Sequence, residues 1–134
     1  MGYLIDTSTL IRLEKAKISN HFLKDLEDST ILGVSAITAS ELLHGVHRAK
    51  EASMKAKRSA FVEGVLETLT LYPFDLKAAR AHAEIWALLA TQKIVISAHD
   101  LLIGATALSL GFGVVTANPK DFERIPGLSV KIVG

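Results

Sequence analysis

The chain of 134 residues is long enough for one domain with a large hydrophobic core, since 49% of its residues are hydrophobic and 22% are charged. It contains no cysteine, which excludes disulfides, thiolate zinc sites and a cysteine nucleophile. A formal net charge of +1 excludes a basic surface spread over the whole molecule, so any nucleic-acid binding has to be local. The first residues contain neither a basic segment nor a long apolar run. We therefore expect a cytoplasmic protein without a signal peptide or membrane span.

Short apolar segments alternate with amphipathic ones along the whole chain, which predicts strands alternating with helices. The expected strands lie at 3–5, 31–35, 71–72, 113–116 and 129–133, and the expected helices at 7–15, 18–28, 38–48, 51–69, 76–91 and 96–111. On the helix that Asp75 caps, we expect an inward face made of Leu76, Ala79, Ala83, Trp86 and Ala90. This order predicts a single α/β domain over residues 1–134, in which helices cover both faces of a short parallel sheet.

The segment 96–111 is apolar on almost every side and stops at a glycine, Gly111, so it predicts a helix inside the domain. Its first turn nevertheless carries a carboxylate, Asp100. One interpretation is a helix cap, because Ser97 and Asp100 have the spacing of a capping box. The other is a ligand that a rigid helix holds over a functional site.

Other acids follow the predicted strands, where ligands bind in parallel α/β sheets. Asp6 follows the first strand, and Glu41 opens the helix after the second. Asn118 and Asp121 follow the strand that comes after the Asp100 helix. We therefore expect four acids to converge on one edge of the sheet, with Asn118 between them.

Such a cluster of acids has a definite chemistry. Two carboxylates about 4 Å apart repel by roughly 4 kcal/mol at an effective dielectric constant of about 20. Several of them stay ionised together only with a cation, and otherwise some must hold protons. Oxygen ligands alone select a hard ion such as Mg²⁺ or Mn²⁺, which activates water for in-line attack on phosphate. The cluster thus predicts metal-assisted hydrolysis of a phosphodiester.

Each member of the cluster also has an ordinary structural interpretation. Asp6 can cap the helix that follows it, and Glu41 can complete a capping box with Thr38. Asp121 has the setting of a solvated loop acid, and Asn118 that of a turn residue. These separate roles do not explain why the residues share one edge of the sheet.

The histidines and the basic residues are less informative. His44 and His47 lack the spacing of a zinc protease or a second Glu-x-x-His, so we expect them on a helix surface. His99 is either a plain loop histidine or a phosphate contact. The basic stretch 47–58 is either a solvated helix face or a surface that follows a nucleic-acid backbone.

Four segments of the sequence together resemble the PIN domain, in the form seen in VapC toxins. They are Leu4-Ile-Asp-Thr-Ser8, Thr38-Ala-Ser-Glu-Leu-Leu-His-Gly45, His99-Asp-Leu-Leu-Ile-Gly-Ala-Thr-Ala-Leu108 and the segment 115–128 that begins Val115-Thr-Ala-Asn-Pro-Lys-Asp121. The resemblance implies a PIN-like three-layer α/β/α fold and an Mg²⁺- or Mn²⁺-dependent endoribonuclease that is the toxin of a toxin–antitoxin pair. It also implies an RNA substrate, a homodimer and inhibition by a VapB-like antitoxin.

The resemblance assigns roles residue by residue. Asp6, Glu41 and Asp100 correspond to the acidic triad that holds the metal, with Asp6 and Asp100 as its chief ligands. The fourth acidic position of the family falls on Asn118, and Asp121 is the acid near enough in sequence to take its place. Lys93 stands where the family often has glycine.

Two other functions remain open from the sequence. A phosphatase of the haloacid dehalogenase type would use Asp6 as its nucleophile, although that chemistry needs a second acid at the position of Ser8. A non-catalytic RNA-binding module would use the same cleft, and its carboxylates would be dispensable.

Overall fold

The computed structural model describes residues 2–15 and 31–133, so the helix expected at 18–28 lies outside the described residues. Within them, five parallel strands form one sheet in the order β3-β2-β1-β4-β5. The strands are β1 (Gly2–Ile5), β2 (Ile31–Ser35), β3 (Thr70–Tyr72), β4 (Gly113–Thr116) and β5 (Val130–Ile132). The predicted parallel sheet is confirmed.

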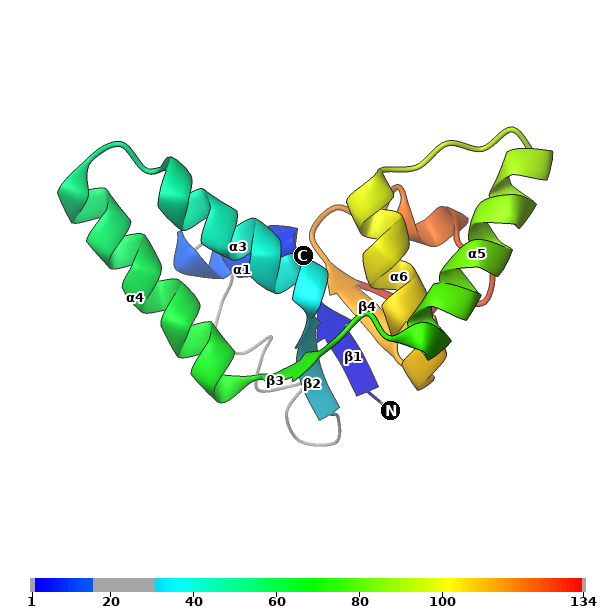
Figure 1. Ribbon diagram of the computed structural model, residues 1–134, viewed down its shortest axis with the longest axis horizontal. Coiled ribbons are helices and arrows are strands. Elements are labelled where there is room, and N and C mark those ends of the chain that lie inside the picture. The colour runs from blue at the N-terminus through cyan, green and yellow to red at the C-terminus, as the bar shows by residue number, and fades with distance from the viewer. Residues whose placement is uncertain (1, 16–30, 134) are drawn as a thin grey trace.

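Helices lie on both sides of this sheet, and Figure 1 shows them as two groups with the strands between them. One group consists of α1 (Thr7–Glu14), α3 (Ala36–Arg48) and α4 (Ala52–Thr68), and the other of α5 (Leu76–Thr91) and α6 (Ala98–Leu110). A short 3-10 helix, η1 (Phe122–Arg124), follows β4. None of these helices has both the length and the hydropathy that a membrane span requires.

The alternation of side chains along β1 divides the hydrophobic core in two. Leu4 belongs to a buried cluster with residues of α5 and α6, such as Leu89 and Ile103. Ile5, the next residue, belongs to a second cluster with residues of α1, α3 and α4, such as Leu10 and Val62. Adjacent residues of one strand thus face opposite helix layers, as the three-layer α/β/α prediction requires.

The strand order also determines where a ligand site lies. β1 is the middle strand, and the chain extends the sheet on one side with β2 and β3 and on the other with β4 and β5. The order therefore reverses between β1 and β4, and ligands of open α/β sheets bind outside the carboxyl ends of the strands at such a point. The residues that follow β1 and β4 include Asp6 and Asn118.

The inward face predicted for α5 is wrong. Leu76 and Trp86 are 67% and 63% exposed, whereas Ala78, Ile85 and Leu89 are the buried residues of this helix. The reason is that α5 packs chiefly against α6 and so needs only a narrow contact stripe. The exposed Trp86 ring lies 5.4 Å from the ring of His82.

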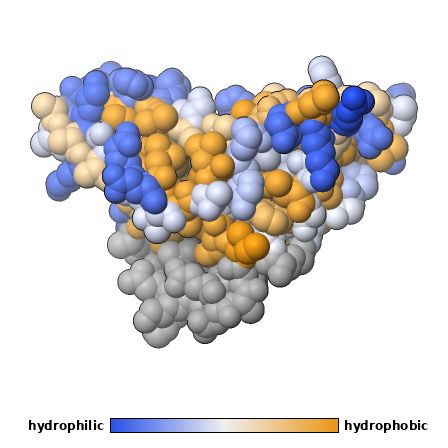
Figure 2. Space-filling view, turned by 60° about the horizontal axis from the view of Figure 1, so that its bottom comes forward, coloured by the Kyte–Doolittle hydropathy of each residue, from blue (hydrophilic) through white to orange (hydrophobic). Residues whose placement is uncertain are grey.

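Exposed hydrophobic side chains occur on more than one element. Figure 2 shows hydrophobic residues across the middle of one face of the molecule and hydrophilic residues on its two upper flanks. The large exposed side chains include Ile31 and Leu71 on β2 and β3, and Val95 in the loop after α5, which is 85% exposed. Scattered exposure of this kind is normal, whereas the α5 side concentrates several such residues.

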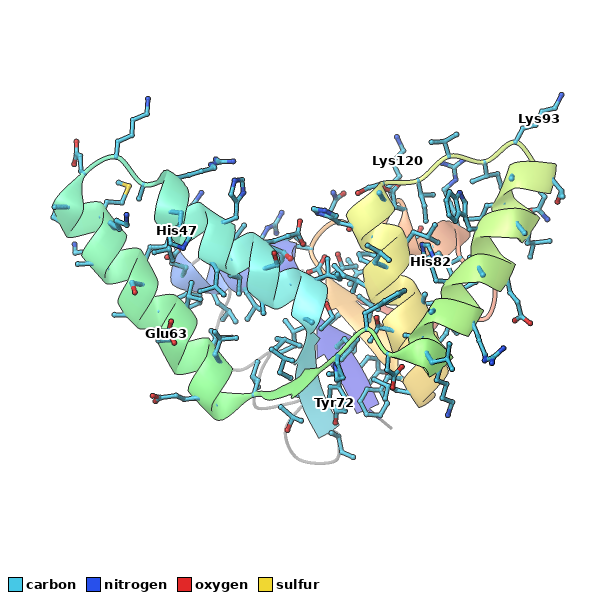
Figure 3. All side chains as sticks on the ribbon, viewed as in Figure 1. His47, Glu63, Tyr72, His82, Lys93 and Lys120 are labelled. Carbon is cyan, nitrogen blue, oxygen red and sulfur yellow. The ribbon has the colours of Figure 1, made fainter. Side chains whose placement is uncertain are left out.

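The loop from α5 to α6 begins with a residue in an unusual conformation. Lys93 has φ +57°, in the left-handed region that favours glycine, and it follows the last residue of the helix cap, Gln92. The amide groups of Lys93 and Ile94 donate to the carbonyls of Ala90 and Leu89, at 3.1 and 2.9 Å, which is the Schellman arrangement. The Lys93 side chain points away from the molecule in Figure 3. The protein thus accommodates lysine, where glycine is often found in the PIN-like sequences that it resembles, at the cost of a strained backbone.

We predict that Lys93→Gly stabilises the protein by about 1 kcal/mol, because glycine adopts the left-handed conformation without a Cβ penalty. Urea unfolding of the variant beside the wild type measures this difference. Lys93→Ala is the control, since it removes the same charge but keeps the Cβ atom. A glycine variant that is no more stable than the alanine variant would contradict the assignment of strain to this residue.

Candidate active site

Asp6 is a buried carboxylate at the junction of β1 and α1, with only 4% of the residue exposed. Its Oδ1 caps α1 by accepting the Thr9 amide at 3.0 Å, and also the Thr9 hydroxyl at 2.8 Å. The Ser8 hydroxyl donates to this carboxylate at 2.9 Å, and the Thr116 hydroxyl of β4 donates to Oδ2 at 2.6 Å. The capping interpretation of Asp6 is therefore correct, but it accounts for only one of the two oxygens.

Glu41 has no part in the capping box that the sequence suggested. The N-cap of α3 is Ser35, whose hydroxyl accepts the Thr38 amide at 3.0 Å, so Glu41 lies in the second turn of the helix. Its two oxygens instead contact neighbouring helices. The Thr7 hydroxyl of α1 donates to Oε1 at 2.6 Å, and Nδ1 of His99 at the start of α6 lies 3.2 Å from Oε2. Glu41 therefore connects three helices at the edge of the sheet.

The capping-box interpretation of Ser97 and Asp100 is also wrong, and the contact that replaces it changes the interpretation of Asp121. Ser97 is the N-cap, but its side chain makes no capping hydrogen bond. Its backbone amide, which a capping box would pair with Asp100, donates instead to Oδ2 of Asp121 at 3.0 Å. Asp121 is thus a half-buried anchor for α6 rather than a solvated loop acid. Asp100 is left without a capping task.

The surroundings of Asp100 favour its protonated form. Burial, then a hydrogen bond with Asp121 and the charge of Asp121, and finally the charges of Asp6 and Glu41, raise the pKa of Asp100 from 3.8 to about 7. All four acids are consequently close enough to interact electrostatically. The predicted convergence on one edge of the sheet is what the structure shows.

The remaining candidate residues differ in position. Asn118 is exposed; its backbone amide donates to the Thr116 hydroxyl at 2.9 Å, and no hydrogen bond of its side chain occurs within the described ranges. His44 and His47 are exposed on α3, as expected. His99 is the partner of Glu41 rather than a plain loop residue.

Sequence reasoning missed the hydroxyl groups around the acids. Thr7, Ser8, Thr9 and Thr116 all donate to Asp6 or Glu41. The run of three hydroxyl residues directly after Asp6 was a usable signal, because a buried carboxylate needs several donors. The contribution of Thr116 had no such signal, since it comes from a strand 110 residues further along the chain.

The donor set fits a hard divalent ion in its chemistry. The acids present only oxygen atoms, and their mutual repulsion at Asp100 is the condition that a cation relieves. Among residues 2–15 and 31–133, however, no three His, Asp or Glu side chains form a ready ligand set for one ion. Such a site suits Mg²⁺, which usually keeps several water ligands and binds a protein through one or two carboxylates.

Comparison with known proteins defines the class of this fold and site. A family model for the PIN domain matches residues 3–128, which is nearly the whole chain. The chain therefore belongs to the PIN domain family, as the resemblance of its motifs predicted. This membership excludes the phosphatase interpretation of Asp6 from further consideration.

Relatives and solved structures narrow the class to the VapC ribonucleases. The chain is 40% identical over 133 residues to ribonuclease VapC1 of Rickettsia felis, covering 99% of this chain and 97% of that protein. It is 32% identical over 132 residues to the tRNA(fMet)-specific endonuclease VapC of Salmonella typhimurium, covering 98% of this chain and 97% of that protein. The crystal structure of VapBC2 from Rickettsia felis bound to a DNA fragment from their promoter superimposes with a TM-score of 0.90 and 25% identity, over 100% of both chains.

We predict that Thr116→Val lowers the free energy of unfolding by about 2 kcal/mol, because it removes a donor from buried Asp6 and the acceptor of the Asn118 amide. Urea unfolding measures the loss. Thr106→Val is a matched control, since Thr106 is as buried but its hydroxyl only donates to the Leu102 carbonyl within α6. Equal losses in the two variants would contradict the role of Thr116.

A second prediction concerns pH. Because the folded protein holds the Asp100 proton more tightly than the unfolded chain, ionising Asp100 costs folding free energy, and this cost grows from about pH 4 to about pH 7. Asp100→Asn removes the cost, so in EDTA the variant should gain stability over the wild type across this range and keep the gain above it. Melting temperatures at several pH values test the prediction.

The control is Asp75→Asn at the N-cap of α5, because asparagine caps a helix about as well as aspartate. This variant should follow the wild type at every pH. If Asp100→Asn also follows the wild type, the fold does not raise the pKa of Asp100.

Proposed function

We propose that this chain is the toxin of a VapBC-type toxin–antitoxin pair, and that it cuts RNA phosphodiester bonds with a divalent metal ion, Mg²⁺ or Mn²⁺. The observation that carries the proposal is the convergence of Asp6, Glu41, Asp100 and Asp121, from four separate segments, on the switch point of a parallel sheet. The identity with VapC ribonucleases over nearly the full length of both chains supports the reaction.

The proposed roles follow from how each side chain is held. Asp6 and Asp100 would be the chief ligands of the ion, and Glu41 a further one. A bound ion would supply Lewis-acid activation of the phosphodiester and of the attacking water. Thr7 and His99 fix the orientation of Glu41. Because its side chain is already held in one conformation, this carboxylate can position the attacking water or a ligand of the ion. Asp121 holds the start of α6, and with it Asp100, in place.

Asp100 also has a use in its protonated form. A carboxyl group with a pKa of about 7 is partly protonated at neutral pH, so the apo site carries less negative charge than four ionised acids would. Asp100 would lose this proton if it bound a cation. The site can thus exist without an ion and still accept one.

The proposed partners are an antitoxin of the VapB kind, RNA and a second copy of the chain. The VapBC2 complex that superimposes on this chain supports the first of these. For the homodimer, the exposed apolar residues Leu76, Leu88 and Trp86 of α5 offer a surface that self-association would cover. An enzyme with these partners would act in the cytoplasm, where its RNA is.

The proposed function is tested by incubating the purified chain with RNA in the presence of Mg²⁺, Mn²⁺ or excess EDTA. We expect cleavage with either ion and none in EDTA, and we expect Glu41→Gln to cut the rate by orders of magnitude. Cleavage that persists in EDTA would exclude a metal-dependent site. RNA that is bound but never cut, with Glu41→Gln binding equally well, would support the non-catalytic module instead.

A further prediction concerns the fourth acidic position. Asp121→Ala removes both the acceptor of the Ser97 amide and a charge beside Asp100, whereas Asn118→Ala removes an exposed amide. We therefore expect Asp121→Ala to lower the cleavage rate at least tenfold more than Asn118→Ala, a difference of about 1.4 kcal/mol in activation free energy. Single-turnover rates with saturating Mg²⁺ measure it. The reverse ranking would assign the fourth position to Asn118.

A further inference from the structure

A cavity of about 370 Å³ opens beside the acidic cluster, on the side of α1, α3 and α4. Glu41 and His99 line its inner end, where the cavity meets the candidate active site. Its volume lies at the lower end of the roughly 300–1,000 Å³ that is usual for small-molecule sites. None of the roles described above uses this space.

One face of α3 forms a wall of the cavity. Glu41, Gly45 and Arg48 line it, at positions that share a helix face because they are four and three residues apart. At a rise of about 1.5 Å per residue, the wall runs roughly 10 Å from Glu41 to Arg48. Gly45 has no side chain to fill the middle of this wall, and even a Cβ atom there would meet only Arg58, at 3.8 Å. The cavity is therefore a trough that leads from the acids to a cation.

The charges along the trough change sign with distance from the cluster. Both acids of its lining are engaged, since Glu41 contacts Thr7 and His99 and Glu14 pairs with Arg58 at 3.8 Å. Lys15 and Arg48 also line the cavity, and neither has an anionic partner in the described part of the chain. Among residues 2–15 and 31–133, the outer half of the trough thus carries positive charge without an acidic partner, which attracts an anion.

The far wall, which α4 provides, suits a nucleic-acid base. Phe61 of α4 lines the cavity and is only partly buried, so part of its ring is accessible from the trough. Aromatic rings of this kind stack with bases of single-stranded nucleic acids, whatever the base, and basic side chains beside them bind the backbone. Arg48 and Arg58 both belong to the basic stretch 47–58, for which the sequence suggested contact with a nucleic-acid backbone.

We infer that this trough binds the RNA strand on one side of the scissile phosphodiester, with a phosphate at Arg48 and Lys15 and a base against Phe61. The inference rests on the proposed function, because it takes the acidic cluster as the place of cleavage. The charges favour single-stranded RNA as the ligand of the trough. One phosphate of the strand would lie at the basic end, and the scissile phosphate would lie at the acids, where a metal ion has to offset the repulsion. The repulsive acids and the attractive trough would together define the direction in which the strand enters.

The test measures binding of a short fluorescein-labelled single-stranded RNA by anisotropy, in EDTA, with every variant placed in an Asp100→Asn background so that no cleavage intervenes. Arg48→Glu should raise the Kd about tenfold. The matched control is Arg80→Glu on α5, which is also exposed and changes the net charge equally, and it should raise the Kd less than about twofold. Arg48→Ala should flatten the dependence of log Kd on log salt by about 0.7, as loss of one phosphate contact does for single strands.

A second pair of variants tests the base contact. Phe61→Leu keeps an apolar side chain but removes the stacking surface, so it should raise the Kd about tenfold. Phe74→Leu, at a half-buried aromatic residue just before α5, is its control and should leave the Kd nearly unchanged. Unfolding curves of all five variants establish that each is folded at the assay temperature.

The outcomes separate the inference from the proposed function. Equal effects of Arg48→Glu and Arg80→Glu would mean that only overall charge matters, and this would overturn the inference. If neither Arg48→Glu nor Phe61→Leu changes the Kd, the inference is also overturned. The trough would then be a binding site for a protein partner instead of RNA. The proposed function fails in another way, when the wild-type chain leaves RNA uncut with Mg²⁺ and with Mn²⁺, whatever the binding data show.

Discussion

The carboxylate of Asp6 is the constraint on which the rest of the site depends. A buried charge is tolerated only when hydrogen-bond donors replace its water, and here donors come from both sides of the central strand pair. Ser8 and Thr9 supply them from the start of α1, and Thr116 supplies one from the end of β4. The same contacts fix the register of β1 against β4, because they require Thr116 to end its strand beside Asp6. Stability and the candidate active site are thus served by one set of hydrogen bonds.

Asp100 and Asp121 show how a tertiary contact can replace the local hydrogen bond that a sequence pattern predicts for a side chain. In an isolated helix, Asp100 would accept the amide of Ser97, as the sequence pattern indicates. In the folded chain Asp121 accepts that amide, and Asp100 turns to a site where burial and three other acids oppose its charge. The rest of the fold has to offset the free energy that this unfavourable position of Asp100 costs.

The sequence alone was sufficient for the fold class, the order of the described elements and the edge at which the acids meet. Hydrophobic periodicity predicts the strands and helices. Ligands of parallel α/β sheets bind at the carboxyl ends of the strands, and this rule then predicts where the acids lie. It was insufficient for the partners of the acids, because a local spacing such as Ser97 to Asp100 cannot reveal that a residue 24 positions after Ser97 competes for the same amide. It also failed on α5, where the bulk of Leu76 and Trp86 suggested a core face but packing against α6 selected Ala78 and Leu89.

The separation of Asp6 and Thr116 along the chain has a consequence for biosynthesis. The strand that completes the surroundings of Asp6 carries Thr116, which lies 110 residues further along the chain. β1 cannot pair with β4 until the segment between them and β4 itself have emerged from the ribosome, and contacts of such high sequence separation form late. A nascent chain therefore holds Asp6 without the Thr116 donor until β4 has been synthesised.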